Sequence, residues 1–220
     1  MKKPKIFIAC DTTNLNKVKK IMTQSKTNKI KIGYKFGLEF MNSKNGRKFI
    51  SSIKNKIIFI DLKLNDTVNT MLSAVKALRD LKINYLTVHI SSGLAALRAV
   101  KKVSGKIKIV GVTTLTSLNN NDLRLIGYNK SVKNLVAHQA KLAKRAALDA
   151  LVCSPYEVSG VRKIFKREII TPGVQIGRKN YDQKRSMEAK KVQSDWLVIG
   201  RAITRGNIKK NIQNLSKELQ

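Results

Sequence analysis

Three charged residues stand close together at the end of one apolar run, which reads IIFIDLKLND over residues 57–66. If this run is a β-strand, its two-residue side-chain period places Asp61 and Lys63 on the same face. Burying an isolated charge is costly, so these two groups and the nearby Asp66 indicate an array whose charges compensate one another. Opposite charges about 4 Å apart attract by roughly 4 kcal/mol at an effective dielectric constant of about 20, which favours a charged lysine. The pattern predicts a lysine that donates a proton rather than one that forms a Schiff base. A structural ion pair that caps the strand is the alternative.

Polar side chains also end several other apolar runs. Asp11 ends the first run, Lys31 lies near the end of the second, His89 ends the fourth and Thr116 follows the fifth. In a barrel of parallel strands these ends share one rim, so the four side chains are candidates for the same site. The structural alternatives are a rim histidine that bonds backbone groups and a lysine that extends into solvent. Lys35 has the same parity as Lys31, and we expect it to lie in the loop beyond the strand.

A candidate phosphate site follows the last two apolar runs, which read TPGV (171–174) and IGRAIT (199–204). The loops after the seventh and eighth strands of such barrels often bind phosphate. Gly200 would let a backbone N–H group approach an anion closely, and Arg201 would open a helix and add a cation. Gly-Arg is a weak motif alone, and its place after the last strand strengthens it.

Short runs rich in isoleucine, valine and leucine recur at nearly even spacing. We expect strands at residues 5–11, 29–33, 57–64, 85–90, 107–115, 151–154, 169–174 and 196–200. Between them the apolar residues have helical spacing, for example over 68–81 and 132–148. Strands that alternate with helices predict right-handed crossovers and a parallel sheet, and eight such units fit an α/β protein with a (β/α)8 TIM barrel. A doubly wound sheet is disfavoured because no GxGxxG motif follows the first run.

Composition is that of an ordinary globular chain with an unusual charge. With 220 residues, 42% of them hydrophobic, we expect one barrel domain over 1–220. Forty-five lysines and arginines against 13 acidic residues give a formal charge of +32, which favours anionic partners. A nucleic-acid-binding protein is therefore an alternative from another class. Against it, aromatic residues make up only 5% of the chain, and the sequence shows no clustered stacking platform for bases and no long basic tail.

The cysteines and the apolar runs exclude several other classes. Cys10 and Cys153 lie far apart with no histidine beside either, which disfavours a disulfide framework and a zinc site. The first apolar run is short and is interrupted by Asp11, and no window approaches the roughly 20 apolar residues of a membrane span. We expect a cytoplasmic protein with no signal peptide.

Short motifs at the ends of the runs form a recognisable set. They are ACD (9–11), KIG (31–33), DLKLND (61–66) followed by NT (69–70), VHISSG (88–93), VTTLTS (112–117), VCS (152–154), TPG (171–173), DQ (182–183) and IGR (199–201). This set resembles the orotidine 5′-phosphate decarboxylase family over essentially the whole chain. The DxKxxD core is shared with related sugar-phosphate enzymes, whereas NT, LTS and DQ favour the decarboxylase.

The resemblance implies a homodimeric barrel that converts orotidine 5′-monophosphate to uridine 5′-monophosphate without a metal or an organic cofactor. Carried over by position, Lys63 would deliver a proton to C6, and Asp61 would face the departing carboxylate. Asp66 and Thr70 would reach across the dimer interface into the partner's site. For the rest of the substrate the implied ligands are Asp11 and Lys31 for the ribose, Thr116 for the pyrimidine, and Gln183, the Gly200 amide and Arg201 for the phosphate.

Two positions depart from the family pattern. Thr67-Val68 stands where the family usually has isoleucine and proline, and Gln175 stands where it has arginine, with Arg178 as a possible replacement. The alternative within the same fold is a magnesium-dependent sugar-phosphate decarboxylase or aldolase, which a chelator would inactivate. We expect a small-molecule substrate, no membrane and no specific nucleic acid.

Overall fold

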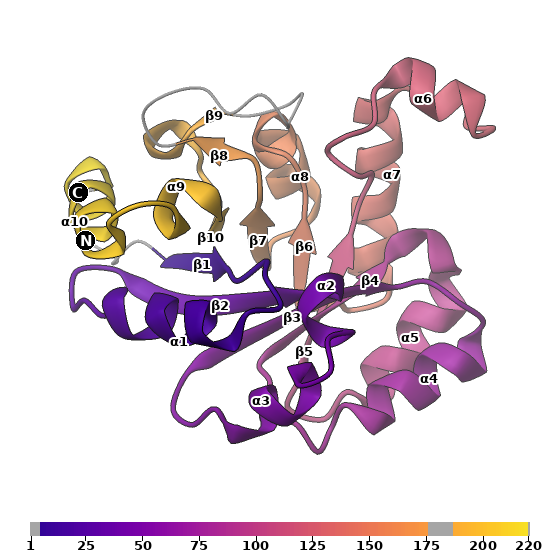
Figure 1. Cartoon of the computed structure of the whole chain (residues 1–220). Coiled ribbons are helices and arrows are strands. Elements are labelled where there is room, and N and C mark those ends of the chain that lie inside the picture. Colours follow the sequence, from indigo (N-terminus) through magenta and orange to yellow (C-terminus); the bar gives the residue numbers. More distant parts are fainter. Residues whose placement is uncertain (1–4, 176–186, 220) are drawn as a thin grey trace.

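Strands alternate with helices throughout the computed structural model, which describes residues 5–175 and 187–219 (Figure 1). In these ranges eight parallel strands close into a barrel in the order β1-β10-β7-β6-β5-β4-β3-β2. The barrel strands are β1 (Lys5–Ala9), β2 (Lys31–Gly37), β3 (Ile57–Leu64), β4 (Tyr85–His89), β5 (Lys108–Val112), β6 (Ala150–Val152), β7 (Glu168–Thr171) and β10 (Trp196–Ile199). The predicted TIM barrel is confirmed.

The helices follow the strands and pack around the barrel (Figure 1). They are α1 (Leu15–Gln24), α2 (Leu38–Met41), α3 (Gly46–Ser52), α4 (Val68–Ala77), α5 (Gly93–Val103), α6 (Asn120–Leu125), α7 (Val132–Arg145), α8 (Val158–Ile164), α9 (Arg201–Thr204) and α10 (Ile208–Glu218). Short 3-10 turns are η1 (Ile90–Ser92), η2 (Pro155–Glu157) and η3 (Ala189–Lys191), and β8 (Val174–Gln175) pairs with β9 (Met187–Glu188) in a small separate ladder. The helix predicted over 132–148 is α7, and it ends at Arg145 because Ala147 adopts a left-handed backbone (φ 55°).

Strand β2 differs most from its prediction. It begins at Lys31, whose partner is Lys5 at the start of β1, and it runs on through Lys35. It continues past the apolar run because Tyr34 and Phe36 are buried on its outward face, against the helices. The prediction that Lys35 lies in a loop is therefore wrong.

Aromatic rings fill the interior of the barrel. Phe7, Phe59, Tyr85 and Trp196 come from four different strands and are at most 4% exposed. The rings of Phe7 and Trp196 stack with their centroids 4.2 Å apart. Gly33 makes room for this packing, since a Cβ atom at that position would lie 2.6 Å from the Phe7 ring. These rings form an apolar floor under the carboxyl-terminal mouth of the barrel.

The opposite mouth is closed by Glu168, the first residue of β7. Its carboxylate accepts hydrogen bonds from Tyr85 Oη at 2.9 Å, Lys108 Nζ at 3.0 Å and Trp196 Nε1 at 3.4 Å. Lys5 Nζ lies 3.4 Å from the same carboxylate. Each of the five residues is the first of its strand, so one acid joins five strands at this end.

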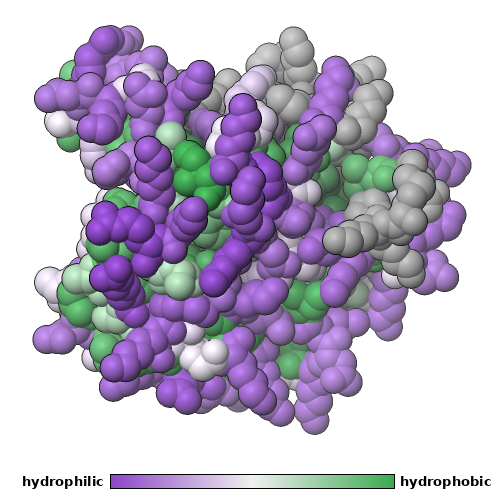
Figure 2. Space-filling view, turned by 180° about the vertical axis from the view of Figure 1, so that it is seen from behind, coloured by the Kyte–Doolittle hydropathy of each residue, from purple (hydrophilic) through white to green (hydrophobic). Residues whose placement is uncertain are grey.

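Hydrophilic side chains predominate on the face shown in Figure 2, with apolar side chains scattered among them. Among the residues that the structure describes, the large apolar side chains that are exposed are Leu38, Val68, Leu125, Ile126 and Tyr156. Within the described ranges no helix combines the length and the apolar character needed to span a membrane.

Candidate active site

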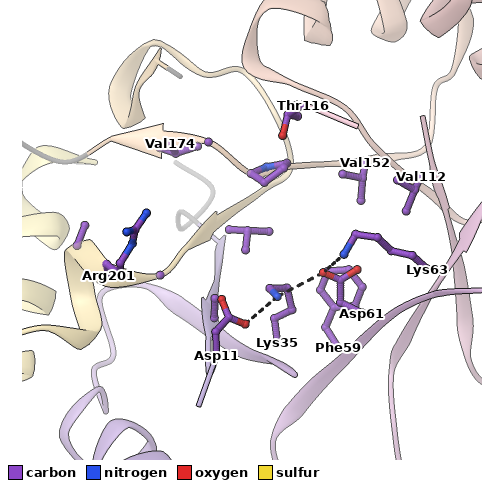
Figure 3. A pocket seen from close by; sticks show the side chains of 16 residues that line it. Asp11, Lys35, Phe59, Asp61, Lys63, Val112, Thr116, Val152, Val174 and Arg201 are labelled. Atoms are coloured by element: carbon purple, nitrogen blue, oxygen red, sulfur yellow. Dashed lines mark hydrogen bonds and ion pairs between the residues drawn. The ribbon is translucent and has the colours of Figure 1, made fainter. Parts of the chain in front are cut away.

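A pocket of about 320 Å³ opens at the carboxyl ends of the strands, above the aromatic floor (Figure 3). Parallel strands of a TIM barrel present their active sites at this end. Six of the residues proposed from the sequence line the pocket together, namely Asp11, Asp61, Lys63, Thr116, Gly200 and Arg201. The apolar part of the wall comes from Phe59, Val112, Val152 and Val198.

Four charged side chains form a continuous chain along one side of this pocket (Figure 3). Lys35 Nζ lies 3.2 Å from Asp11 Oδ1 and 3.3 Å from Asp61 Oδ2. Lys63 Nζ donates to the same Asp61 oxygen at 2.9 Å. The order Asp11, Lys35, Asp61, Lys63 therefore alternates in sign, with one lysine held between two acids and one acid held between two lysines.

Strand β3 changes its geometry where it delivers Lys63. The pairing with β4 shifts between Ile60 and Leu64, and Lys63 has a left-handed backbone with φ 49°. Its backbone N–H donates to Thr87 Oγ1 at 2.8 Å. An irregularity of this kind re-aims a side chain at the end of a strand, and here Nζ of Lys63 still reaches Asp61 as the simple alternation predicts.

Burial and the neighbouring charges act against each other on the two inner groups. Burial raises the pKa of Asp61, but the charges of Lys35 and Lys63 outweigh it, so this pKa lies below its ordinary value. Burial lowers the pKa of Lys35, but Asp61 and Asp11 outweigh it, so this pKa lies above its ordinary value. Both side chains, each 12% exposed, are therefore charged at neutral pH.

His89, at the end of β4, stands at the edge of this chain. Burial lowers its pKa, and the positive charge of Lys63 lowers it further, against a smaller opposing effect of Asp61. The imidazole is therefore neutral at pH 7. It adds no positive charge near Lys63.

The prediction that Lys31 belongs to the site is wrong. Lys31 is exposed at the amino-terminal start of β2, paired with Lys5, and it does not line the pocket. Four residues further along the same strand, Lys35 takes the place between Asp11 and Asp61 that the sequence reading gave to Lys31.

Asp66 and Thr70 lie outside the pocket of the single chain. Both are exposed, at the loop before α4 and in its first turn. Asp66 Oδ1 accepts from the backbone N–H of Thr67, and the hydroxyls of Thr67 and Thr70 lie 3.0 Å apart. Among the described residues the ion pair of Lys63 is with Asp61, and none is formed between Lys63 and Asp66, the second acid of the DxKxxD motif.

The other end of the pocket carries the candidate phosphate ligands. Gly200 follows β10 and caps the start of α9, and Arg201 begins that helix beside the pocket (Figure 3). Thr116 lies on the loop after β5, across the pocket from the charged chain (Figure 3). Gln183 and Arg178 fall outside the described residues, as does the side chain of Gln175.

Lys35 and Thr87 are site residues that the sequence reading did not select. Both occupy inward-facing positions that the two-residue period gives, Lys35 two residues after Gly33 and Thr87 two residues before His89. The apolar run stops before Lys35, and Thr87 is a common strand residue, so neither position stood out.

The chain matches known proteins over most of its length. The family model described as orotidine 5′-phosphate decarboxylase / HUMPS family matches residues 4–211. The chain belongs to this family.

Curated relatives and a solved structure agree with this assignment. The orotidine 5′-phosphate decarboxylase of Wolbachia pipientis subsp. Culex pipiens is 40% identical over 90% of this chain and 91% of its own length. That of the Wolbachia of Brugia malayi is 38% identical over 96% of both chains. The crystal structure of orotidine 5′-phosphate decarboxylase from Lactobacillus acidophilus superposes with a TM-score of 0.84 at 27% identity, covering all of both chains. Family membership thus extends over the whole barrel.

Proposed function

We propose that this protein removes the carboxylate of orotidine 5′-monophosphate and produces uridine 5′-monophosphate. The observation that carries the proposal is the chain Asp11, Lys35, Asp61, Lys63 at the mouth of a barrel of this family. The curated relatives named above, 38–40% identical, support the same activity.

Lys63 supplies the positive charge that the reaction needs. Loss of carbon dioxide from C6 leaves a carbanion in the plane of the ring, which resonance stabilises little, so the protein must place a cation where the negative charge develops. The ammonium of Lys63, held 2.9 Å from Asp61, faces the pocket and is 35% exposed. Lys63 then delivers a proton to C6, which completes the product.

Asp61 faces the carboxylate that leaves. Lys35 and Lys63 keep it ionised, so its charge is available to repel a bound carboxylate and to fix the Lys63 ammonium. Lys35 and Asp11, at the other end of this series of charged side chains, bind the ribose hydroxyls.

The remaining substrate groups fall to the far side of the pocket. Thr116 faces the pyrimidine, and the Gly200 amide, Arg201 and Gln183 hold the phosphate. The span from Lys63 to Arg201 lies within one pocket, which supports binding of the reacting ring and the phosphate together. Binding energy from the distant phosphate can then stabilise the transition state at C6.

A magnesium-dependent sugar-phosphate enzyme of the same family is the second candidate. Such an enzyme would use the acids of the DxKxxD motif as metal ligands. Here Asp61 already lies within 3.3 Å of two ammonium groups, and Asp66 is exposed and does not line the pocket. This arrangement favours the decarboxylase, because two neighbouring cations repel a divalent ion.

The first experiment follows the ultraviolet absorbance of orotidine 5′-monophosphate in the presence of EDTA. We expect the wild-type protein to consume the substrate, and we expect Lys63→Ala to lose turnover by at least roughly 1,000-fold while it keeps its circular dichroism and melting temperature. Activity that EDTA abolishes and magnesium restores would favour the sugar-phosphate enzyme instead.

We propose further that the working form is a cytoplasmic homodimer, in which Asp66 and Thr70 complete the partner's site. Two features of the single chain support this. Both residues are exposed at the start of α4, and Val68 between them leaves 39% of its surface exposed beside the rim. An apolar side chain flanked by two polar ones fits a subunit contact.

Mixing two inactive variants tests the shared site. Asp66→Ala and Lys63→Ala subunits are each expected to be inactive as homodimers, whereas each heterodimer contains one site with both residues intact. We expect the mixture to regain up to about one quarter of wild-type turnover when subunits exchange at random. Proven subunit exchange without any regained turnover would count against a site that spans the interface.

A further inference from the structure

Thr87 is a buried polar residue directly behind the proposed reaction centre. It lies in the middle of β4, is 0% exposed, and is not among the residues that line the pocket. Its neighbours along the inward face of β4 are Tyr85, in the aromatic floor, and His89, at the rim. Thr87 therefore lies between the floor and the four charged side chains, and its hydroxyl contacts protein groups.

Its hydroxyl group makes two hydrogen bonds, and both go to the central residues of the site. Thr87 Oγ1 accepts from the backbone N–H of Lys63 at 2.8 Å and donates to Asp61 Oδ1 at 3.0 Å. A hydroxyl has one proton to give and lone pairs that accept, so this single group can serve both partners at once.

The bond to Lys63 holds the irregular part of β3. The strand pairing with β4 is interrupted between Ile60 and Leu64, so the Lys63 N–H has a side-chain acceptor in place of a ladder partner. Lys63 also has a left-handed backbone, which non-glycine residues adopt only when their surroundings enforce it. The threonine hydroxyl satisfies a donor that the irregularity would otherwise leave unpaired.

The bond to Asp61 fixes the rotation of its carboxylate. With Oδ1 held by Thr87, the other oxygen, Oδ2, is turned toward Lys35 at 3.3 Å and Lys63 at 2.9 Å. The same hydroxyl thus holds the backbone from which the Lys63 side chain extends. It also holds the Asp61 carboxylate with which the Lys63 ammonium pairs.

We propose that Thr87 is a positioning residue for the decarboxylation, acting through its hydroxyl on the Lys63 backbone and on the Asp61 carboxylate. The inference rests on the proposed function, because the reaction it serves is proton delivery by Lys63. It assigns a role in the reaction to a buried residue of β4 that does not line the pocket.

Thr87→Val tests the proposal, since valine keeps the shape of threonine and has no hydroxyl. We expect kcat to fall roughly 10- to 100-fold, because a small misplacement of reacting groups is enough for such a loss. We expect KM to change less than about three-fold, since the ligands of the ribose and phosphate are untouched. Thr87→Ser keeps the hydroxyl and is expected to retain kcat within about three-fold of wild type.

Ser216→Ala is the control. Ser216 lies in α10, is 2% exposed, and its hydroxyl donates to Ile212 O at 2.7 Å, outside the residues that line the pocket. This variant also loses a buried hydroxyl and its hydrogen bond, and we expect it to keep kcat and KM within about two-fold of wild type because α10 contributes no residue to the pocket.

The outcomes separate the possible failures. If Thr87→Val keeps wild-type kcat, or if Thr87→Ser loses as much kcat as Thr87→Val, the hydroxyl does not position the site and the proposal is overturned. Should the valine variant fail to fold, Thr87→Ala replaces it, and failure of both to fold would make the hydroxyl a folding determinant and overturn the proposal as well. Wild-type and Ser216→Ala proteins that both leave orotidine 5′-monophosphate unconsumed would refute the proposed activity instead.

Discussion

Lys35 connects the two acidic residues that face the pocket from different strands. It reaches Asp11 beyond β1 and Asp61 in β3 from the strand between them. Its removal would leave the buried charge of Asp61 with Lys63 as its only close cation among those described, and it would release Asp11 altogether. Breaking a buried ion pair by removing one partner is more damaging than never having had the pair.

We therefore expect Lys35→Met to lower kcat/KM for orotidine 5′-monophosphate by roughly 100- to 1,000-fold. The measurement is steady-state turnover, with the far-ultraviolet spectrum as a check of folding. Lys31→Met is the control, because it makes the same change on the same strand at the exposed opposite end. Equal losses in the two variants would contradict the assignment of Lys35 to the site.

The core of the site was readable from residue spacing, and its surroundings were not. Alternation over 57–66 places Asp61 and Lys63 on one face, and the structure joins them at 2.9 Å. The same alternation points to Lys35, but the polar residues after Gly33 looked like a loop because tertiary packing of Tyr34 and Phe36 extends the strand. The direction in which Asp66 turns depends on the loop before α4, and side-chain period carries no information about it.

At the scale of the elements, a glycine on β2 makes room for the aromatic rings inside the barrel. Gly33 on β2 faces the ring of Phe7 on β1, and the neighbouring strands contribute Phe59 and Trp196 to the same layer. Rings of this size leave no room for a side chain at position 33. The packing of the aromatic floor therefore depends on the absence of a side chain at Gly33.

We expect Gly33→Ala to lower the free energy of unfolding by about 1–3 kcal/mol, because the added methyl group would overpack the layer. Urea titration followed by circular dichroism measures this change. Gly160→Ala in α8 is the control, since a Cβ atom there meets nothing within 4 Å, and it is expected to stabilise the protein by about 0.5–1 kcal/mol. A neutral Gly33→Ala would show that the rings can shift.

The existence and order of the elements were predictable, and their ends were less so. Strand β3 has the predicted bounds, while β5 ends at Val112 rather than three residues later. Beyond it, Thr113 and Thr114 are buried, and their hydroxyls donate to Val152 O and to Gln139 Oε1. This segment is therefore buried like a strand although it is not one. Burial by tertiary contacts imitates a strand pattern at such positions.

At the scale of the whole molecule, the barrel has a reactive mouth and a sealed one. Glu168 joins β7 to four other strands at the sealed mouth. Burial raises the pKa of this carboxyl group, but hydrogen bonds from Lys108 and Tyr85 outweigh it, so the pKa lies below its ordinary value of 4.5. Burial and the charge of Glu168 raise the pKa of Tyr85 to about 12, which keeps its hydroxyl a donor.

We expect Glu168→Gln to destabilise the protein by about 2 kcal/mol at pH 7. Because the folded state depresses this pKa, the contribution of Glu168 is complete above the unfolded value and is lost as pH falls through the folded one. The difference between variant and wild type should thus be constant above about pH 5 and shrink below about pH 4. Chemical denaturation across this range measures it, with Glu39→Gln, an exposed acid on α2, as a control expected to change stability by less than about 0.5 kcal/mol. A difference that grows on acidification would have the wrong sign for this account.

The net charge of +32 is a property of the surface as a whole. Many of the described carboxylates are already paired with lysine or arginine, for example Asp80, Asp149 and Asp195, and the 45 basic residues far outnumber the 13 acidic ones. Such a surface draws a substrate that carries a phosphate and a carboxylate toward the molecule. Steeply salt-dependent binding of random oligonucleotides would instead favour the nucleic-acid alternative.

The pairing of β1 with β10 joins strands almost two hundred residues apart (Figure 1). During synthesis on the ribosome, the nascent chain presents Asp61 and Lys63 long before Trp196–Ile199 emerges to close the ring, and Arg201 follows only then. Until that moment β1 and β7 are open edges, with unpaired backbone groups and the aromatic layer uncovered on one side. The addition of β10 is therefore the step that closes the sheet and removes its two open edges. Protection of the nascent chain by chaperones would matter most just before this step.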